Sequence, residues 1–178
     1  MKKTALVLAA VLALTSPVWA QWKIGAGGSF GAASPMCDVF AEVTLNEALG
    51  NLTEEFQGFN VAIRCNLGTM VSDEGVSAFT FDATALVPLS LEMIQAYFGA
   101  GAGAGNGALV ADEGAAEGFF FTVNGIAGVE LPLDEVTGME LPFGNGYGVY
   151  GQVRFLGQMV EGGFNVLTLP GAGLYVNF

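Results

Sequence analysis

Residues 169–178 read LPGAGLYVNF and place apolar side chains at every second position up to an aromatic last residue, Phe178. In a β-strand successive side chains point to opposite faces, so Leu174, Val176 and Phe178 share one face. The stretch therefore predicts a final strand with one continuous apolar face. Pro170 lies inside this strand, and because proline has no backbone N–H, it predicts a bulge or interrupted pairing there.

The same period of two recurs along the rest of the chain. In residues 58–67, GFNVAIRCNL, the apolar residues Phe59, Val61 and Ile63 alternate with smaller or polar ones. A helix would scatter such a set around its circumference, whereas a strand sorts it onto one face. The alternating segments are 22–30, 37–46, 58–67, 77–87, 94–105, 119–131, 147–155 and 164–178. They predict eight strands.

One segment has a competing interpretation. Residues 93–111, MIQAYFGAGAGAGNGALVA, are uncharged and could form a transmembrane helix with small-residue packing. However, glycine recurs at every second position from Gly99 to Gly107, and each glycine costs a helix roughly 1 kcal/mol relative to alanine. A strand instead separates a glycine face from an alanine face. We therefore interpret this segment as a strand.

Residues 1–20 have the pattern of a secretory signal peptide. Two lysines precede an apolar core at residues 5–14, and Val-Trp-Ala at residues 18–20 forms a small-x-small cleavage site. The apolar run is too short to cross a bilayer as a helix. We predict cleavage after Ala20 and a single β-barrel domain over residues 21–178.

The strongly negative net charge of the chain disfavours anionic partners. The whole chain has a net charge of −12, and without residues 1–20 three basic residues face 17 acidic ones, a net charge of −14. The three basic residues are Lys23, Arg64 and Arg154. Nucleic acids and anionic head groups are therefore poor partners, because they would be repelled.

The two faces of the predicted strands indicate what surrounds them. The chain is 52% hydrophobic and 12% charged, and the less apolar faces consist mostly of Gly, Ser, Thr, Asn and Tyr. Such a face is a poor water-facing surface but suits a narrow interior, while the apolar face suits lipid. If the first strand runs upward from the periplasm, aromatic residues gather near both ends of the strands, as in the girdles of membrane barrels. Because lipid requires every backbone polar group to be paired, we predict a closed, antiparallel, eight-stranded up-and-down transmembrane β-barrel.

These features resemble the small eight-stranded outer-membrane barrels of the OmpX and OmpA-transmembrane type. The resemblance rests on the signal peptide, the motifs AYFGAGAGAG and VNGIAGVELPL, and the closing segment GAGLYVNF. It implies a monomer in the bacterial outer membrane, in contact with membrane lipid and inserted by the outer-membrane assembly machinery. It also implies that the alternating residues of the last strand form the assembly signal, namely Ala172, Leu174, Val176 and Phe178.

The second and third strands allow a register to be predicted. If the hairpin between them is centred on Asn51, inward Asp38 lies opposite Arg64, and outward Cys37 lies opposite Cys65. This register predicts an interior Asp38–Arg64 ion pair. It leaves two outcomes open for the cysteines, a disulfide or two unpaired thiols, because not every cross-strand pair has the geometry of a disulfide.

The sequence offers little for catalysis or for cofactors. It contains no histidine, so a serine or aspartate nucleophile would lack the usual base. We identify no catalytic residue, no cofactor site and no metal site, since the acidic loops lack the spaced ligands of a calcium loop. The leading hypothesis is a non-enzymatic outer-membrane barrel with a structural or surface-interaction role through short acidic loops. Two alternatives stay open, a secreted lipocalin-like carrier of an apolar ligand and a narrow, low-conductance channel.

Overall fold

The structure is a computed structural model that describes residues 21–30, 35–45, 61–72, 75–107, 118–139, 141–160 and 163–178. The predicted signal peptide and the hairpin centre at Asn51 lie outside these residues. The strands are β1 (Gln21–Phe30), β2 (Pro35–Thr44), β3 (Ala62–Ser72), β4 (Gly75–Leu91), β5 (Ile94–Gly107), β6 (Phe119–Pro132), β7 (Gly146–Val160) and β8 (Gly163–Asn177). One short helix, α3 (Leu133–Thr137), follows β6.

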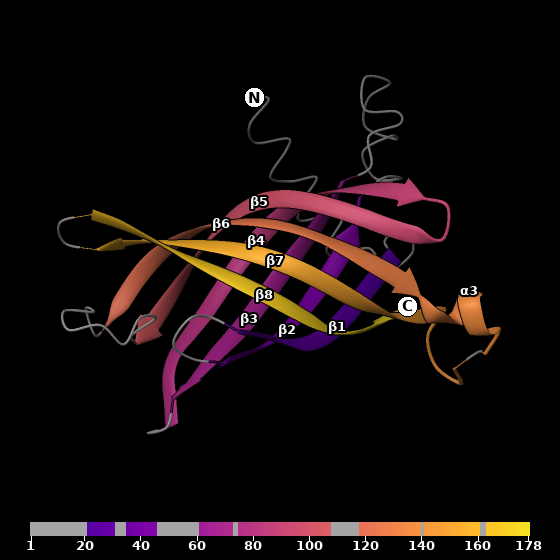
Figure 1. Cartoon of the computed structure of the whole chain (residues 1–178), viewed down its shortest axis with the longest axis horizontal. Helices are drawn as coiled ribbons and strands as arrows, with labels where there is room; N and C mark the ends of the chain where they lie inside the picture. Colours follow the sequence, from indigo (N-terminus) through magenta and orange to yellow (C-terminus); the bar gives the residue numbers. More distant parts are fainter. Residues whose placement is uncertain are drawn as a thin grey trace, which may run out of the picture.

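The strands form a closed barrel in which each strand pairs with its neighbour in sequence and β8 returns to β1 (Figure 1). All eight pairings among the described strands are antiparallel. The predicted all-β, eight-stranded up-and-down barrel is therefore confirmed. Among the described residues, no helix is long and apolar enough to cross a membrane.

The pairing register shows that the barrel is narrow and its strands are tilted. When cross-strand partners are followed from Phe119 once around the wall, the path returns to β6 at Val129, ten residues further along. Such a stagger accompanies strands tilted by about 35–45° to the barrel axis. A barrel of eight strands has an interior just wide enough for side chains to fill.

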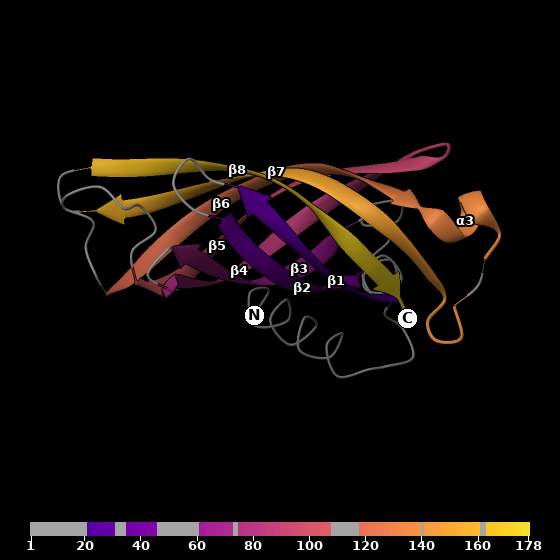
Figure 2. The ribbon, with the colours of Figure 1, turned by 60° about the horizontal axis from the view of Figure 1, so that its bottom comes forward.

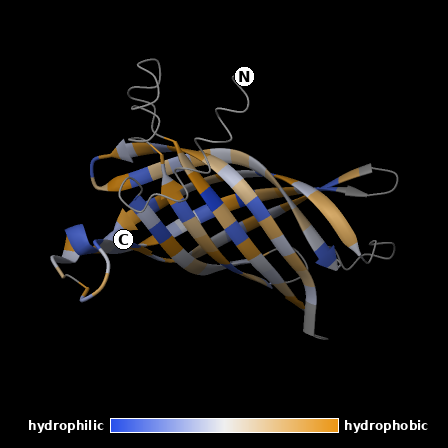
Figure 3. Ribbon diagram, turned by 180° about the vertical axis from the view of Figure 1, so that it is seen from behind, coloured by the Kyte–Doolittle hydropathy of each residue, from blue (hydrophilic) through white to orange (hydrophobic). Residues whose placement is uncertain are grey.

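Exposure alternates along the strands as the sequence predicts. In β6, Phe121 and Val123 are exposed, whereas Thr122 and Asn124 are buried inside the barrel. Figure 3 shows the resulting chequered pattern of hydrophobic and hydrophilic residues along the wall. The outer surface is therefore mainly apolar, and the polar residues of the strands face inward.

The glycine-rich segment forms β5, which confirms its interpretation as a strand. Gly101 and Gly103 face inward, and a Cβ atom on either would collide with the backbone of β4, at Ala83 and Phe81 respectively. Gly105 is covered by the ring of Phe120. Glycine at these positions thus allows β5 to approach β4 closely and leaves interior room for large neighbours.

The expectation for Pro170 is only partly met. Pairing between β7 and β8 continues past Pro170, which faces Val153, with no register shift. The expected bulge is therefore absent. Pairing between β8 and β1 ends one residue away, at Gly171 and Ser29.

Backbone hydrogen bonds explain why the β1–β8 pairing ends there. Phe178 and Trp22 exchange N–H···O bonds in both directions, so even-numbered residues of β8 direct their backbone groups toward β1. Pro170 is even-numbered, and its missing N–H is on the β1 side. β8 is nevertheless held in place here, because its pairing with β7 continues along the other edge.

Both ends of the described barrel chain lie at one end of the barrel, here called the terminal end. Figures 1 and 2 show α3 at this end, near the C-terminus. Gly138 ends α3 in a left-handed conformation with φ 68°, and its N–H bonds to the carbonyl of Asp134.

At the opposite end, called the far end, an apolar cluster fills the interior. Its buried members come from six strands, and the partly buried Leu167 packs against them. They are Met36, Met70, Ala78, Phe120, Leu156 and Leu169. The polar interior described below therefore lies between this apolar cluster and the terminal end.

Candidate functional site in the barrel interior and at its terminal mouth

All three basic residues beyond residue 20 point into the barrel. Arg64 is 0% exposed and Arg154 is 2% exposed, and both are held by carboxylates. Lys23 is nearly buried and also forms ion pairs. The inward positions follow from the period of two, since each of these residues alternates with outward apolar neighbours.

The largest charged cluster joins four side chains from four strands. The Lys23 Nζ atom lies 3.2 Å from Glu42 Oε1 and 2.6 Å from Glu130 Oε2. The Arg64 Nη2 atom lies 2.6 Å from Glu42 Oε2 and 3.0 Å from Glu130 Oε1. We call these four residues the interior ion cluster. Its two positive and two negative charges balance, which is required for charges buried away from water.

Arg64 has further partners inside the barrel. Its Nη1 atom donates to Tyr97 Oη at 3.2 Å and to Gln152 Oε1 at 3.3 Å. Its guanidinium carbon lies 4.1 Å from the ring centroid of Phe40 and 4.6 Å from that of Tyr97. Aromatic ring faces and carboxylates together compensate for the loss of water around the guanidinium.

A second, smaller polar group lies elsewhere in the interior. The Arg154 Nη2 atom pairs with Asp82 Oδ2, and Asn66 Nδ2 donates to Asp82 Oδ1 at 2.8 Å. Thr84 Oγ1 donates to Asn124 Oδ1 at 3.0 Å. The polar interior is thus a set of side-chain bonds that connects several strands.

The predicted Asp38–Arg64 ion pair is wrong. In the observed register Arg64 faces Glu42, and Asp38 faces Gly68. The strands are therefore shifted by four residues from the predicted register. Asp38 does point inward, but its Oδ1 atom has no hydrogen-bond partner among the described residues.

The physical reason for this error is the spacing of the two acids. Asp38 and Glu42 both face inward on β2, so either register gives Arg64 a carboxylate. Centring the hairpin on Asn51 favoured Asp38. The observed register lets Arg64 share Glu42 with Lys23 and also reach Glu130 on β6, which a hairpin considered alone does not reveal.

The cysteines are also placed differently from the prediction. Cys37 faces Thr69, and Cys65 faces Ala41. Both thiols are free, so of the two outcomes left open the structure shows unpaired cysteines. Both lie on the outward face, where each acts as a small apolar residue.

The residues of the predicted assembly signal lie on the outer wall of β8. Leu174 and Phe178 are exposed large apolar side chains, and Ala172 is exposed as well, while Val176 is half-buried. Their shared outward face agrees with the alternation in the sequence. Their recognition by an assembly machinery stays a prediction.

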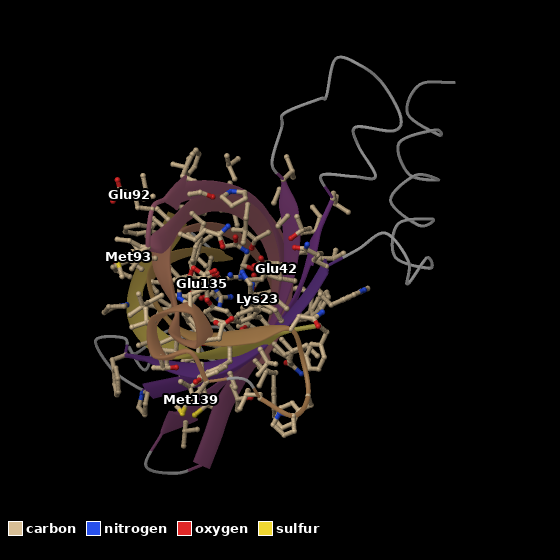
Figure 4. The ribbon with its side chains drawn as sticks, turned by 90° about the vertical axis from the view of Figure 1, so that its right-hand side faces the viewer. Lys23, Glu42, Glu92, Met93, Glu135 and Met139 are labelled. Carbon is tan, nitrogen blue, oxygen red and sulfur yellow. The ribbon has the colours of Figure 1, made fainter. Side chains whose placement is uncertain are left out.

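The terminal end contains a polar opening. A cavity of about 510 Å³ lies there, and its lining includes members of the interior ion cluster. Figure 4 looks into this opening, with Lys23 and Glu42 inside it, Glu135 of α3 beside them, and Glu92 and Met93 at the rim. Tyr175 and Trp22 also line the cavity. Among the described residues, no three His, Cys, Asp or Glu side chains come together as a metal site would require.

Sequence reasoning missed the interior ion cluster. The period of two puts Lys23, Glu42, Arg64 and Glu130 on the less apolar faces of their segments, but it does not show which of these residues meet. Three inward basic residues in a narrow interior imply inward acids within reach of each, because an uncompensated buried charge is costly. That requirement is the signal that could have linked β1, β3 and β6.

Comparison with known proteins supports the fold. No protein-family model matches the chain, and no curated protein matches it in sequence. The N-terminal β-barrel domain of OprF from Pseudomonas aeruginosa is similar in structure, with a TM-score of 0.57 and 14% identity over 89% of this chain and 97% of that domain. Neisserial surface protein A (NspA) is also similar, with a TM-score of 0.54 and 13% identity over 89% of this chain and 96% of that chain.

These likenesses concern the fold, because the sequence identities are low. The chain has the fold of the small eight-stranded outer-membrane β-barrels, as the resemblance in its sequence implied.

Proposed function

We propose that the chain is a monomeric integral protein of the bacterial outer membrane, without enzymatic activity, with a structural or surface-interaction role. The observation that carries this proposal is the distribution of polarity across the wall. The interior holds four acidic and all three basic residues of the described strands. Large apolar residues such as Phe81, Val123 and Leu174 lie exposed on the outside.

This distribution fits lipid better than water. An apolar outer band lets the barrel contact hydrocarbon, while the closed ring of strands pairs the backbone groups of the wall. A lipocalin-like carrier would need the opposite arrangement, with an apolar interior to hold its ligand. The interior ion cluster and the Arg154–Asp82 pair occupy that space, so the carrier hypothesis is less well supported.

The interior also argues against a wide pore. The apolar cluster at the far end and the interior ion cluster form successive layers of side chains from several strands inside the barrel. A narrow channel would need these layers to rearrange. We therefore place conductance second to a structural or surface role.

The proposed absence of catalysis rests on chemistry. The chain has no histidine, and most of its interior carboxylates are engaged in ion pairs. A surface-interaction role would fall to the connections between strands, where the remaining acidic residues stand in the sequence. At the far end these connections span residues 31–34, 73–74, 108–118 and 161–162, so they range from two to eleven residues. Their partner would carry complementary basic groups.

Fractionation tests the proposed location. The full chain, tagged and expressed in a Gram-negative host, should sediment with the outer membrane and require detergent for release. Unheated samples should migrate differently from heated ones, because a barrel remains folded in mild detergent. Recovery in the soluble periplasmic fraction would contradict the proposal and favour the carrier. Planar-bilayer recording on the same protein should show no large conductance.

A further inference from the structure

The cavity at the terminal end is not used by the structural role proposed above. Its volume of about 510 Å³ lies in the range of small-molecule sites. Its charged side chains are Lys23, Glu42, Glu92, Glu130 and Glu135. Lys23 and Arg64 balance Glu42 and Glu130, so the excess negative charge of the mouth comes from Glu92 and Glu135, and it favours a cationic ligand over an anionic one.

Two of these carboxylates are already engaged. Glu42 and Glu130 each bind both Lys23 and Arg64 within the interior ion cluster. Glu135, on α3, forms no ion pair with any residue that the structure describes, and it lies at the mouth beside Lys23 (Figure 4). Glu135 thus remains available to a ligand in the opening, as does Glu92 at its rim.

Tyr175 is the second observation that points to a ligand. Its side chain lines the cavity and the residue is only 4% exposed, yet its hydroxyl forms no hydrogen bond with the described residues. The hydroxyl is not one of the fully buried atoms that lack a partner, so solvent reaches it and a ligand in the cavity can bond it. Lys23 Nζ lies 5.1 Å from the centroid of the Tyr175 ring. An alkylammonium group is therefore already bound here by two carboxylates and an aromatic ring.

We propose that this cavity binds an organic ammonium ion, with Glu135 as the ion-pairing group and Tyr175 Oη as a hydrogen-bond acceptor. Trp22 and Phe178, which also line the cavity, supply apolar contact for the carbon chain of the ligand. A metal ion fits less well, because the inner carboxylates are occupied by Lys23 and Arg64. Binding of the ligand requires only the folded barrel. That the cavity faces the periplasm rests on the proposed location in the outer membrane.

An organic ammonium group has two sources in the periplasm, a free polyamine and a lysine side chain of a periplasmic protein. Isothermal titration of the detergent-solubilised protein with spermidine and with a tetralysine peptide separates them. Tighter binding of spermidine assigns the free amine, and tighter binding of the peptide assigns a protein segment. Triacetylated spermidine, which lacks the charges, serves as the uncharged control.

Variants locate the binding site. We expect Glu135→Gln to weaken binding about tenfold and Tyr175→Phe to weaken it severalfold, because each removes one ligand contact. Glu161→Gln, in the connection between β7 and β8, is the matched control and should leave affinity unchanged. Heat-dependent gel mobility confirms that each variant is folded.

Two results would overturn the proposal. One is the absence of binding by either amine to the folded protein. The other is an equal loss for Glu135→Gln and Glu161→Gln, which would show general attraction to an acidic protein. Neither result would affect the fractionation test, so failure of this inference is distinguishable from failure of the proposed location.

Discussion

Replacing Glu130 with glutamine tests whether the interior ion cluster stabilises the barrel. Glu130 Oε2 lies 2.6 Å from Lys23 Nζ and its Oε1 lies 3.0 Å from Arg64 Nη2, and the residue is 2% exposed. Glutamine keeps the shape of the side chain but removes its charge. Two cations would then share only Glu42, which leaves one buried positive charge uncompensated.

The size of the effect follows from this imbalance. Removing one partner from a buried ion pair generally costs about 3–5 kcal/mol, because the remaining charge is stranded away from water. Lys23 is the least buried member and can recover some hydration at the terminal mouth. We therefore expect the lower part of this range, about 3 kcal/mol, for Glu130→Gln.

Urea unfolding of the protein in lipid vesicles, followed by heat-dependent gel mobility, measures the free energy of unfolding. Glu135→Gln is the matched control, since Glu135 is exposed and forms no ion pair with the described residues, and it should change stability by less than about 0.5 kcal/mol. A loss below about 1 kcal/mol for Glu130→Gln would refute the reasoning, because it would mean that the interior accepts an unpaired charge at little cost.

Three further predictions concern the register, the outer face and assembly. Asp38→Asn should leave the free energy of unfolding unchanged or slightly raised, because the Asp38 carboxylate has no ion pair in the structure. A loss of stability as large as that of Glu130→Gln would instead support the register in which Asp38 pairs with Arg64. Val123→Arg should destabilise the vesicle-embedded barrel by about 2–4 kcal/mol, since Val123 lies on the outer wall, and an unchanged urea midpoint would indicate that this face meets water. Phe178→Asp should lower the outer-membrane yield and leave protein in the periplasm, as immunoblots of fractions would show, whereas a normal yield would remove Phe178 from the assembly signal.

The period of two made the strands and their faces predictable. Alternation in the sequence placed Thr122 and Asn124 inside and Phe121 and Val123 outside, as observed. The glycine repeat was assigned to a strand because glycine is costly in a helix and harmless where two strands approach closely. The face that a side chain takes and the cost of glycine in a helix depend on nearby residues alone, so they can be predicted from a short stretch of sequence.

Register was not predictable in the same way. A shift by two or four residues keeps every side chain on its face, so alternation cannot distinguish Glu42 from Asp38 as the partner of Arg64. The choice depends on Glu130 and Lys23, which belong to strands distant in sequence. The candidate cavity depends on α3 as well, a helical turn in a segment that shows no periodicity.

The seam between β1 and β8 is the shortest ladder of the wall, and this has a consequence for how the barrel opens. In this seam Lys23–Ser29 pairs with Gly171–Asn177, and Trp22 and Phe178 add one more hydrogen-bonded pair, whereas β7 and β8 pair along their whole lengths. The strands of the seam come from the two ends of the described chain, so joining them costs the most loop-closure entropy, and we expect this step to complete folding last. Local opening draws on the least stable part of a structure. In hydrogen-exchange experiments the amides of Ala26 and Ala172 should therefore exchange before those of the β7–β8 ladder. The barrel is then closed on average, but it opens transiently along the single ladder between β1 and β8.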